Sequence, residues 1–313
     1  MPPTTTTSRR RHVIDLDDFS AIEIEQVLTT ADSMKEVLSR EIKQVPTLRG
    51  LNVVNMFYEE STRTRISFEL AARALSAGVV NFTARGSSVE KGESLIDTVR
   101  TLQALGADIV VMRHHQSGAP YLVAQHFAGP VINAGDGRHA HPSQALLDLF
   151  TMRERLGQIR DLKVVIVGDI VHSRVARSNL WGLTLMGAQV TLCAPPTLLG
   201  PASYWTSTWP NVTISHHVDL ALEGADVVMA LRIQKERMQG GLLPSLREYS
   251  RTFALTPERL ARLGSHTLIM HPGPMNEGVE IWPEAVAAPN AVIEAQVTNG
   301  VAIRMALLYL LAG

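Results

Sequence analysis

The sequence has little of what several classes of protein require. It contains a single cysteine, Cys193, so no disulfide can form within the chain, which is typical of a reducing compartment. Its 29 lysine and arginine residues are balanced by 30 aspartate and glutamate residues, for a net charge of −1. Nucleic-acid and membrane-surface proteins usually carry a basic excess, so neither kind of partner is expected. We therefore expect a cytoplasmic protein.

Long apolar runs and cofactor motifs are also missing. No uninterrupted apolar stretch approaches the roughly 20 residues that span a bilayer. HExxH and CxxC patterns are absent, and the paired histidines at 114–115 and 216–217 lack the spacing of metal ligands, so no metal is expected. Gly168-Asp169 is not part of a GxGxxG motif, so no nucleotide cofactor is expected. Residues 1–12 lack the apolar core of a signal peptide and are predicted to form a disordered tail.

Short runs rich in valine, isoleucine and leucine alternate with longer helical patterns along the 313 residues. The apolar runs are nearly continuous, as in strands that are buried on both faces of a parallel sheet. The predicted strands are residues 51–58, 107–113, 130–134, 162–168, 188–194, 225–231 and 267–271. The predicted helices are residues 66–77, 93–105, 142–157, 175–186 and 257–263. This alternation predicts an α/β fold of two doubly wound domains, each with a central parallel sheet flanked by helices.

A long helical pattern at residues 141–155 separates the two groups of predicted strands. We place the domain boundary there, with residues 13–150 in the first domain and 151–294 in the second. The last segment, 295–313, is a further helical pattern that is expected to pack back on the first domain. Ligands of open parallel sheets bind outside the carboxyl ends of the strands. The active site is therefore predicted to lie in the cleft between the domains.

The segment from Phe57 to Arg65 restricts the range of possible functions more than any other segment. It follows the apolar run 51–56 and leads into a predicted helix. The free N–H groups and the positive dipole end of a helix N-terminus attract anions. Ser61, Thr62 and Thr64 add hydroxyl donors, and Arg63 or Arg65 adds a planar guanidinium that suits phosphate. The segment therefore predicts a phosphate-like ligand.

Cations, amides and hydroxyls also follow the other predicted strands. These residues are Arg113, His141, Gln144, Ser173, Arg174, Arg232, Gln234 and the segment His271-Pro272-Gly273-Pro274, with the acidic Asp169 a few residues before Ser173. Because they follow strands of both domains, they predict one interdomain cleft for a strongly anionic ligand.

Each of these residues also has an ordinary structural explanation. An arginine at a strand end, such as Arg113, is often a salt-bridged terminus, and Ser173 with Arg174 has the pattern of a helix cap beside a surface cation. His141 before a proline is compatible with a simple helix start, since proline is favoured at the first helical position. Lys91 has the pattern of an exposed turn lysine. Cys193 is expected to pack inside a strand and not to act as a nucleophile.

Taken together, the motifs resemble the aspartate and ornithine carbamoyltransferase family. The phosphate motif of that family is similar to Ser-Thr-Arg-Thr at 61–64, and further matches follow in family order at 112–114, 141–150, 168–178, 232–237 and 271–274. Ornithine enzymes typically carry His-Cys-Leu-Pro where this chain has His-Pro-Gly-Pro, whereas Arg-x-Gln-Lys-Glu-Arg, as at 232–237, is typical of the aspartate enzymes. The two carboxylates of aspartate also suit arginine partners. The chain is therefore most similar to the aspartate enzymes of the family.

The resemblance implies transfer of a carbamoyl group from carbamoyl phosphate to the amine of L-aspartate, an early step of pyrimidine biosynthesis that needs no cofactor. It assigns carbamoyl phosphate to Ser61, Thr62, Arg63, Thr64, Ser87, Arg113, His141, Gln144, Gly273 and Pro274. It assigns aspartate to Lys91, Arg174, Arg232 and Gln234, and the backbone carbonyls of Gly273 and Pro274 also face the amine of aspartate. The implied catalytic set is Arg63, Thr64, Lys91, Arg113, His141 and Gln144.

The resemblance also implies a homotrimer with shared active sites, because the family residues at the positions of Ser87 and Lys91 reach into a neighbouring subunit. Glu59, Arg174 and Arg237 correspond to residues that join the domains on closure. Further assembly with regulatory chains or a dihydroorotase stays open, and so do ornithine as the acceptor and a non-catalytic scaffold role. Gly273 and Met275 depart from the family pattern, in which some relatives have a larger apolar residue and a cation.

Overall fold

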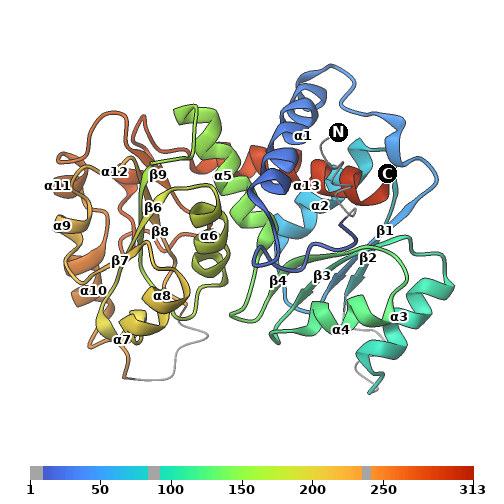
Figure 1. Ribbon diagram of the computed structural model, residues 1–313, viewed down its shortest axis with the longest axis horizontal. Helices are drawn as coiled ribbons and strands as arrows, with labels where there is room; N and C mark the ends of the chain where they lie inside the picture. Colours follow the sequence, from blue (N-terminus) through green and yellow to red (C-terminus); the bar gives the residue numbers. More distant parts are fainter. Residues whose placement is uncertain (1–9, 84–91, 235–240) are drawn as a thin grey trace, which may run out of the picture.

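The computed structural model describes residues 10–83, 92–234 and 241–313. Ser87, Lys91 and Arg237 therefore lie outside the described residues. The described chain forms two parallel β-sheets, one on each side of the molecule, with helices packed around both (Figure 1). The predicted α/β fold with two helix-flanked parallel sheets is confirmed.

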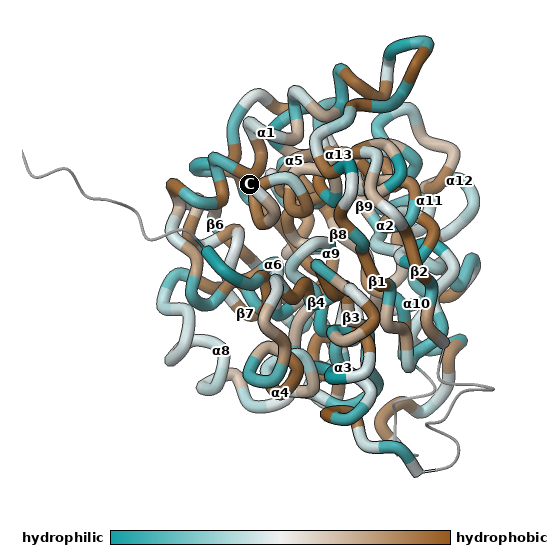
Figure 2. The backbone as a smooth tube through the Cα atoms, turned by 90° about the vertical axis from the view of Figure 1, so that its right-hand side faces the viewer, coloured by the Kyte–Doolittle hydropathy of each residue, from teal (hydrophilic) through white to brown (hydrophobic). Residues whose placement is uncertain are grey.

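The first sheet has the strand order β2-β1-β3-β4. Its strands are β1 (Asn52–Phe57), β2 (Gly78–Thr83), β3 (Ile109–His114) and β4 (Val131–Asp136). On one side lie α1 (Ala21–Ser39), α2 (Thr62–Ala74) and α13 (Ile293–Ala312), and on the other α3 (Leu95–Ala104) and α4 (Ala119–His126) (Figure 1). Both faces of β1 are buried, because Val53 joins the core with α2 while Val54 joins the core with α4. The tube in Figure 2 is accordingly brown, hence hydrophobic, along much of this sheet.

The second sheet has the order β7-β6-β5-β8-β9, and all neighbouring strands are parallel. Its strands are β5 (Lys163–Val167), β6 (Gln189–Cys193), β7 (Val212–Ser215), β8 (Val227–Ala230) and β9 (Leu268–Met270). The helices around it are α6 (Arg174–Leu185), α7 (Pro196–Leu199), α8 (Ala202–Thr208), α9 (Val218–Ala221), α10 (Leu246–Phe253), α11 (Pro257–Leu260) and α12 (Pro283–Val286).

Helix α5 (Pro142–Leu156) lies between the two sheets (Figure 1) and packs against α1, α6 and α13. It begins with proline at its first position and is capped after Leu156 by Gly157, whose φ of 82° suits a residue without a Cβ. Because every residue of α5 from Pro142 to Met152 is buried, this helix joins both halves through one continuous core.

Helix α13 packs against α1, α2 and α5. Among the described helices, it is the one whose length and composition would allow a membrane span. Polar residues such as Gln296 and Arg304 interrupt it, which is why the sequence shows no continuous apolar run here. Some 61% of its apolar window is buried inside the protein, as in a core helix of a globular protein.

Several elements differ from the predictions. Helix α2 begins at Thr62 and not at residue 66, so Arg63 and Thr64 belong to its first turn. Strands β2 and β7 and helices α1, α4 and α10 were not predicted, and the helix expected over 257–263 ends at Leu260. β2 and β7 are edge strands with half-exposed or exposed residues, so they lack the continuous apolar signal of the central strands.

The junction of α5 and α6 gives a test of this core. Leu149 is fully buried, and a Cβ at Gly182 of α6 would lie 2.7 Å from its Cδ1 atom. Leu149→Ala should lower the free energy of unfolding by about 2–5 kcal/mol, because the helices cannot close the cavity fully. Leu105→Ala, at a site that is 77% exposed, should change it by less than about 0.5 kcal/mol. Urea unfolding of both variants measures the difference, and equal effects would contradict this packing.

Candidate active site in the cleft between the sheets

A cleft of about 1360 Å³ lies at the carboxyl ends of strands from both sheets. It brings together every predicted site residue that the structure describes. These residues are Glu59, Ser61, Thr62, Arg63, Thr64, Arg113, His141, Gln144, Arg174, Arg232, Gln234, Gly273 and Pro274. The expectation of a single cleft therefore agrees with the geometry of the described chain.

One end of the cleft is the N-terminus of α2. Ser61 is the N-cap residue, but its side chain makes no capping hydrogen bond within the described part of the chain. No acidic residue lies in the first turn, which contains Thr62, Arg63 and Thr64. The hydroxyls, the first-turn N–H groups and the helix dipole can therefore all act on an anion here.

The Glu59 carboxylate, in the loop between β1 and α2, bridges an arginine of the first sheet and an arginine of a helix that packs on the second sheet. Its Oε1 atom lies 2.6 Å from Nη2 of Arg113 at the end of β3, and its Oε2 atom accepts from Nη1 of Arg174, at the start of α6, at 3.1 Å. Arg113 also donates to the carbonyl of Ala134 at 3.0 Å. The salt-bridge explanation for Arg113 is therefore correct, while the same guanidinium still lines the cleft.

Arg63 lies against the backbone of Gly273. A Cβ at residue 273 would come within 2.3 Å of Nη1 of Arg63, and the φ of 62° also favours glycine. Burial, and then the nearby charge of Arg232, lower the pKa of Arg63. Two guanidiniums therefore face the same space with like charge, an arrangement that favours the binding of an anion between them.

His141 and Ser173 both begin helices, as their structural explanations predicted. His141 is the N-cap residue of α5, and its backbone N–H donates to Oγ of Ser178 on α6 at 2.8 Å. Ser173 caps α6 by accepting from the N–H of Ala176 at 3.1 Å. Since both residues also line the cleft, capping fixes the site on helix ends and does not compete with it.

Asp169 holds the segment after β8 in place. It is buried and accepts from the ring Nδ1 of His172 at 2.7 Å and from the backbone N–H of Gln234 at 3.4 Å. Burial raises its pKa, while the contact with His172 opposes that rise. This contact places Gln234 at the wall of the cleft.

Cys193 lies buried in β6 and outside the cleft, as expected. Burial raises the pKa of its thiol to about 12, so the reactive thiolate is not favoured. The described residues contain no group of three or more histidine, cysteine, aspartate or glutamate side chains that could hold a metal ion.

Several lining residues were not anticipated, including Tyr58, Ser67, Gln296 and Arg304. Arg304 is buried in α13 and donates to Oγ of Ser67 at 2.8 Å. Burial lowers the pKa of Arg304 to about 10. Gln296 and Arg304 could have been identified from the sequence as polar residues inside the otherwise apolar last helix.

Comparison with known proteins agrees with this geometry. A model of the carbamoyl-P binding domain of the aspartate/ornithine carbamoyltransferases matches residues 11–154, and a model of the Asp/Orn binding domain matches residues 160–311. The chain belongs to the aspartate/ornithine carbamoyltransferase family.

Relatives within this carbamoyltransferase family are similar along almost the whole chain. The aspartate carbamoyltransferase catalytic subunit of Chloroflexus aurantiacus is 77% identical over 307 residues, which cover 98% of this chain and 100% of the relative. The subunit of the same name from Heliobacterium modesticaldum is 55% identical and covers 97% and 96%.

Solved structures of aspartate transcarbamoylases share the fold. The M. Jannaschii catalytic subunit has a TM-score of 0.85 at 34% identity and covers 96% of this chain and 98% of its own. The Trypanosoma cruzi enzyme in complex with carbamoyl aspartate and phosphate has a TM-score of 0.89 at 28% identity and covers 99% and 98%.

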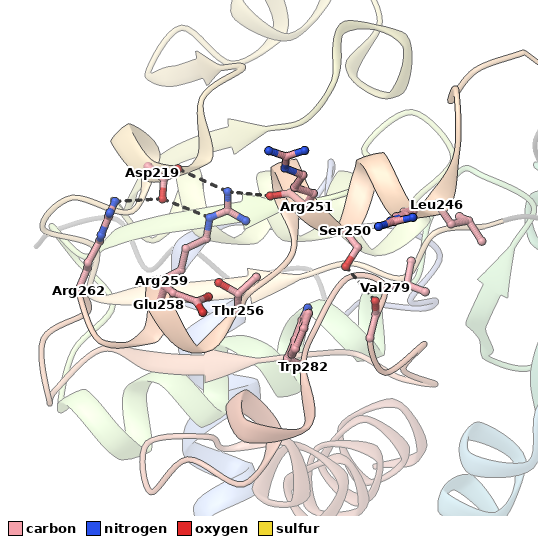
Figure 3. Close-up of a pocket in the computed structure, with 12 residues that line it drawn as sticks. Asp219, Leu246, Ser250, Arg251, Thr256, Glu258, Arg259, Arg262, Val279 and Trp282 are labelled. Atoms are coloured by element: carbon pink, nitrogen blue, oxygen red, sulfur yellow. Dashed lines mark hydrogen bonds and ion pairs between the residues drawn. The ribbon is translucent and has the colours of Figure 1, made fainter.

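A second hollow of about 810 Å³ in this carbamoyltransferase lies beside α10 and α11 and contains none of the predicted site residues (Figure 3). Arg259 occupies it by pairing with Asp219 at 3.2 Å and by donating to the carbonyls of Ala254 and Thr252. Arg262 pairs with the same aspartate. These bonds tie α11 to α9 and α10, so the arginines have a structural role there.

The Glu59 bridge gives a second test. Glu59→Gln should lower the free energy of unfolding by about 3–5 kcal/mol, because two mostly buried guanidiniums then lose their counter-charge. Inorganic phosphate should raise the thermal midpoint of this variant by more than it raises that of the parent protein, since it supplies the missing negative charge. Glu69→Gln removes the charge from an i,i+4 pair with the exposed Arg73, keeps an oxygen that can accept from Asn81, and should cost less than about 1 kcal/mol. Similar losses in both variants would refute the bridge.

Proposed function

We propose that the cleft transfers the carbamoyl group of carbamoyl phosphate to the α-amine of L-aspartate, giving N-carbamoyl-L-aspartate and phosphate. The chain is thus a carbamoyltransferase that catalyses an early step of pyrimidine biosynthesis. The observation that carries this assignment is the convergence of arginines from both sheets on the N-terminus of α2. It is supported by relatives that are named aspartate carbamoyltransferase and by a similar structure in complex with carbamoyl phosphate and aspartate.

In this proposal the phosphate lies at the N-terminus of α2. The hydroxyls and N–H groups of Ser61, Thr62 and Thr64 and the guanidiniums of Arg63 and Arg113 bind it. Thr64, Arg113 and His141 also donate to the carbamoyl oxygen and stabilise the oxyanion of the tetrahedral intermediate. Loss of one such donor typically raises the barrier by about 3–4 kcal/mol.

Aspartate enters from the side of the second sheet. Arg174, Arg232 and Gln234 suit its two carboxylates, and the carbonyls of Gly273 and Pro274 accept from its amine. The amine proton passes to the departing phosphate, which avoids the need for a side-chain base. Catalysis then depends on charge placement and on alignment of the two substrates.

The Glu59 bridge also suits a role in domain closure. Glu59 already joins a residue of β3 to Arg174 of α6, so movement of the two sheets changes its ion pairs. In the proposed closed state, Arg237, which lies outside the described residues, provides a further partner from the second domain.

A homotrimer with shared active sites completes the proposal. Ser87 and Lys91, outside the described residues, would then act in the cleft of a neighbouring subunit. Ile66 and Leu70 expose one apolar face of α2, and Val80 is half exposed on the edge strand β2. Exposed apolar residues beside the site favour a protein interface, and a second copy of the chain suits it.

An acceptor assay tests the function. The purified chain should convert carbamoyl phosphate and L-aspartate into N-carbamoyl-L-aspartate and should leave L-ornithine unreacted. Arg63→Ala should reduce kcat by at least about 100-fold, because a guanidinium that binds the departing phosphate and stabilises its charge is lost. Arg155→Ala removes an exposed arginine of α5 and should leave kcat unchanged. Carbamoylation of ornithine and not of aspartate would sink the assignment.

Subunit mixing tests the shared sites. Lys91→Ala and Arg63→Ala proteins should each be nearly inactive, because each alters every site of its own trimer. Unfolded together and refolded, they should regain activity, since some sites then receive both normal residues. The rate of carbamoyl aspartate formation is measured before and after mixing, and an unchanged rate would rule out the sharing of these two residues.

A further inference from the structure

A buried carboxylate lies behind the cleft and has no part in the mechanism above. Asp148 follows Gln144 by one turn of α5 and is fully buried. Its Oδ1 atom accepts from Nε2 of Gln144 at 3.0 Å and from Nε2 of Gln296 on α13 at 2.8 Å. Its Oδ2 atom accepts from Nδ2 of Asn179 on α6 at 2.9 Å. Three side-chain amides from three helices therefore converge on one carboxylate.

The chemistry of the carboxylate fixes how these amides point. An ionised carboxylate only accepts hydrogen bonds, so each amide must turn its NH₂ group toward Asp148 and its carbonyl oxygen away. For Gln144 this leaves Oε1 without a hydrogen bond to any described residue, on a side chain that lines the cleft. The same constraint makes Oε1 of Gln296 an acceptor.

Gln296 carries this constraint to the opposite wall. Its Oε1 accepts from the backbone N–H of His271 at 3.0 Å, directly after β9. Nδ1 of His271 in turn accepts from the N–H of Gly273 at 2.8 Å. Asp148 is thus linked to both the α5 wall and the segment that ends at Pro274.

We propose that Asp148 is a positioning residue that holds the Gln144 amide with its oxygen toward the cleft, where it accepts an N–H of the carbamoyl group. This inference rests on the proposed function. With the amide reversed, the NH₂ of Gln144 would face the NH₂ of the carbamoyl group, and two donors would oppose each other. Through Gln296, Asp148 also holds the backbone at Gly273.

The surroundings of Asp148 keep it largely ionised near neutral pH. Burial raises its pKa to about 6, while the three amide donors and the charge of Arg304 oppose that rise. Among the described residues, these three amides are the side chains that donate to this carboxylate, so its orienting effect acts on them.

Replacement of Asp148 separates orientation from folding. Asp148→Ala should reduce kcat/KM for carbamoyl phosphate on the order of 10- to 100-fold, because the amide of Gln144 is free to turn. Binding of inorganic phosphate, measured by calorimetry, should change less than about twofold, since the proposed phosphate ligands are on α2 and β3 and not on Gln144. Asp148→Asn keeps an acceptor in the Oδ1 position and should recover most of the loss. Asp148→Ser is the second variant if the alanine protein does not fold, with the same expected split.

Two controls make the result decisive. In a Gln144→Ala background, Asp148→Ala should lower kcat/KM by less than about threefold more, because the residue it orients is gone. Thr151→Ala removes another buried polar side chain of α5. It should change kcat/KM for carbamoyl phosphate and the affinity for inorganic phosphate by equal factors. The proposal would be overturned if the double variant lost kcat/KM by the product of the two single-variant losses. It would also be overturned if Asp148→Ala lost inorganic phosphate binding as strongly as it lost kcat/KM. Failure of the proposed function is a different result, in which the parent chain itself forms no carbamoyl aspartate.

Discussion

The Glu59 carboxylate is the interaction on which the cleft depends. A site for two anionic substrates needs several guanidiniums close together, and these repel one another by roughly 4 kcal/mol per pair at about 4 Å in a partly buried setting. Glu59 offsets this repulsion between Arg113 of β3 and Arg174 of α6, which come from different halves of the molecule. The loop between β1 and α2, the end of β3 and the start of α6 are therefore held together by one charge.

Asp148 serves the same purpose one layer deeper, with amides in place of cations. Glu59 is partly exposed and can exchange partners when a substrate carboxylate or phosphate arrives, whereas Asp148 is sealed between α5, α6 and α13. An exposed carboxylate suits a contact that changes during a catalytic cycle, because water can replace a lost partner. A sealed one suits a fixed orientation, because loss of any partner leaves a buried group unsatisfied.

The sequence predicted the central strands and the polar residues at their ends, because buried parallel strands leave a continuous apolar signal. It did not predict β2 and β7, whose edge positions allow polar residues such as Asn81 and Thr213. No special role for Asp148 was evident from the sequence of the segment 141–150, since its partners Asn179 and Gln296 are distant in sequence. Local patterns show which residues are polar, but only the fold shows which of them meet.

The structure explains why residue 273 is glycine, although some relatives have a larger residue there. A larger residue at this position would collide with the Arg63 guanidinium, whereas glycine leaves the space that this guanidinium occupies. Arg63 thereby lies near enough to Arg232 for the charge of Arg232 to lower the pKa of Arg63. The repulsion between them is relieved when an anion binds, so part of the cost of bringing them together is recovered as affinity for the bound substrates. The closeness of these two arginines therefore favours anionic substrates.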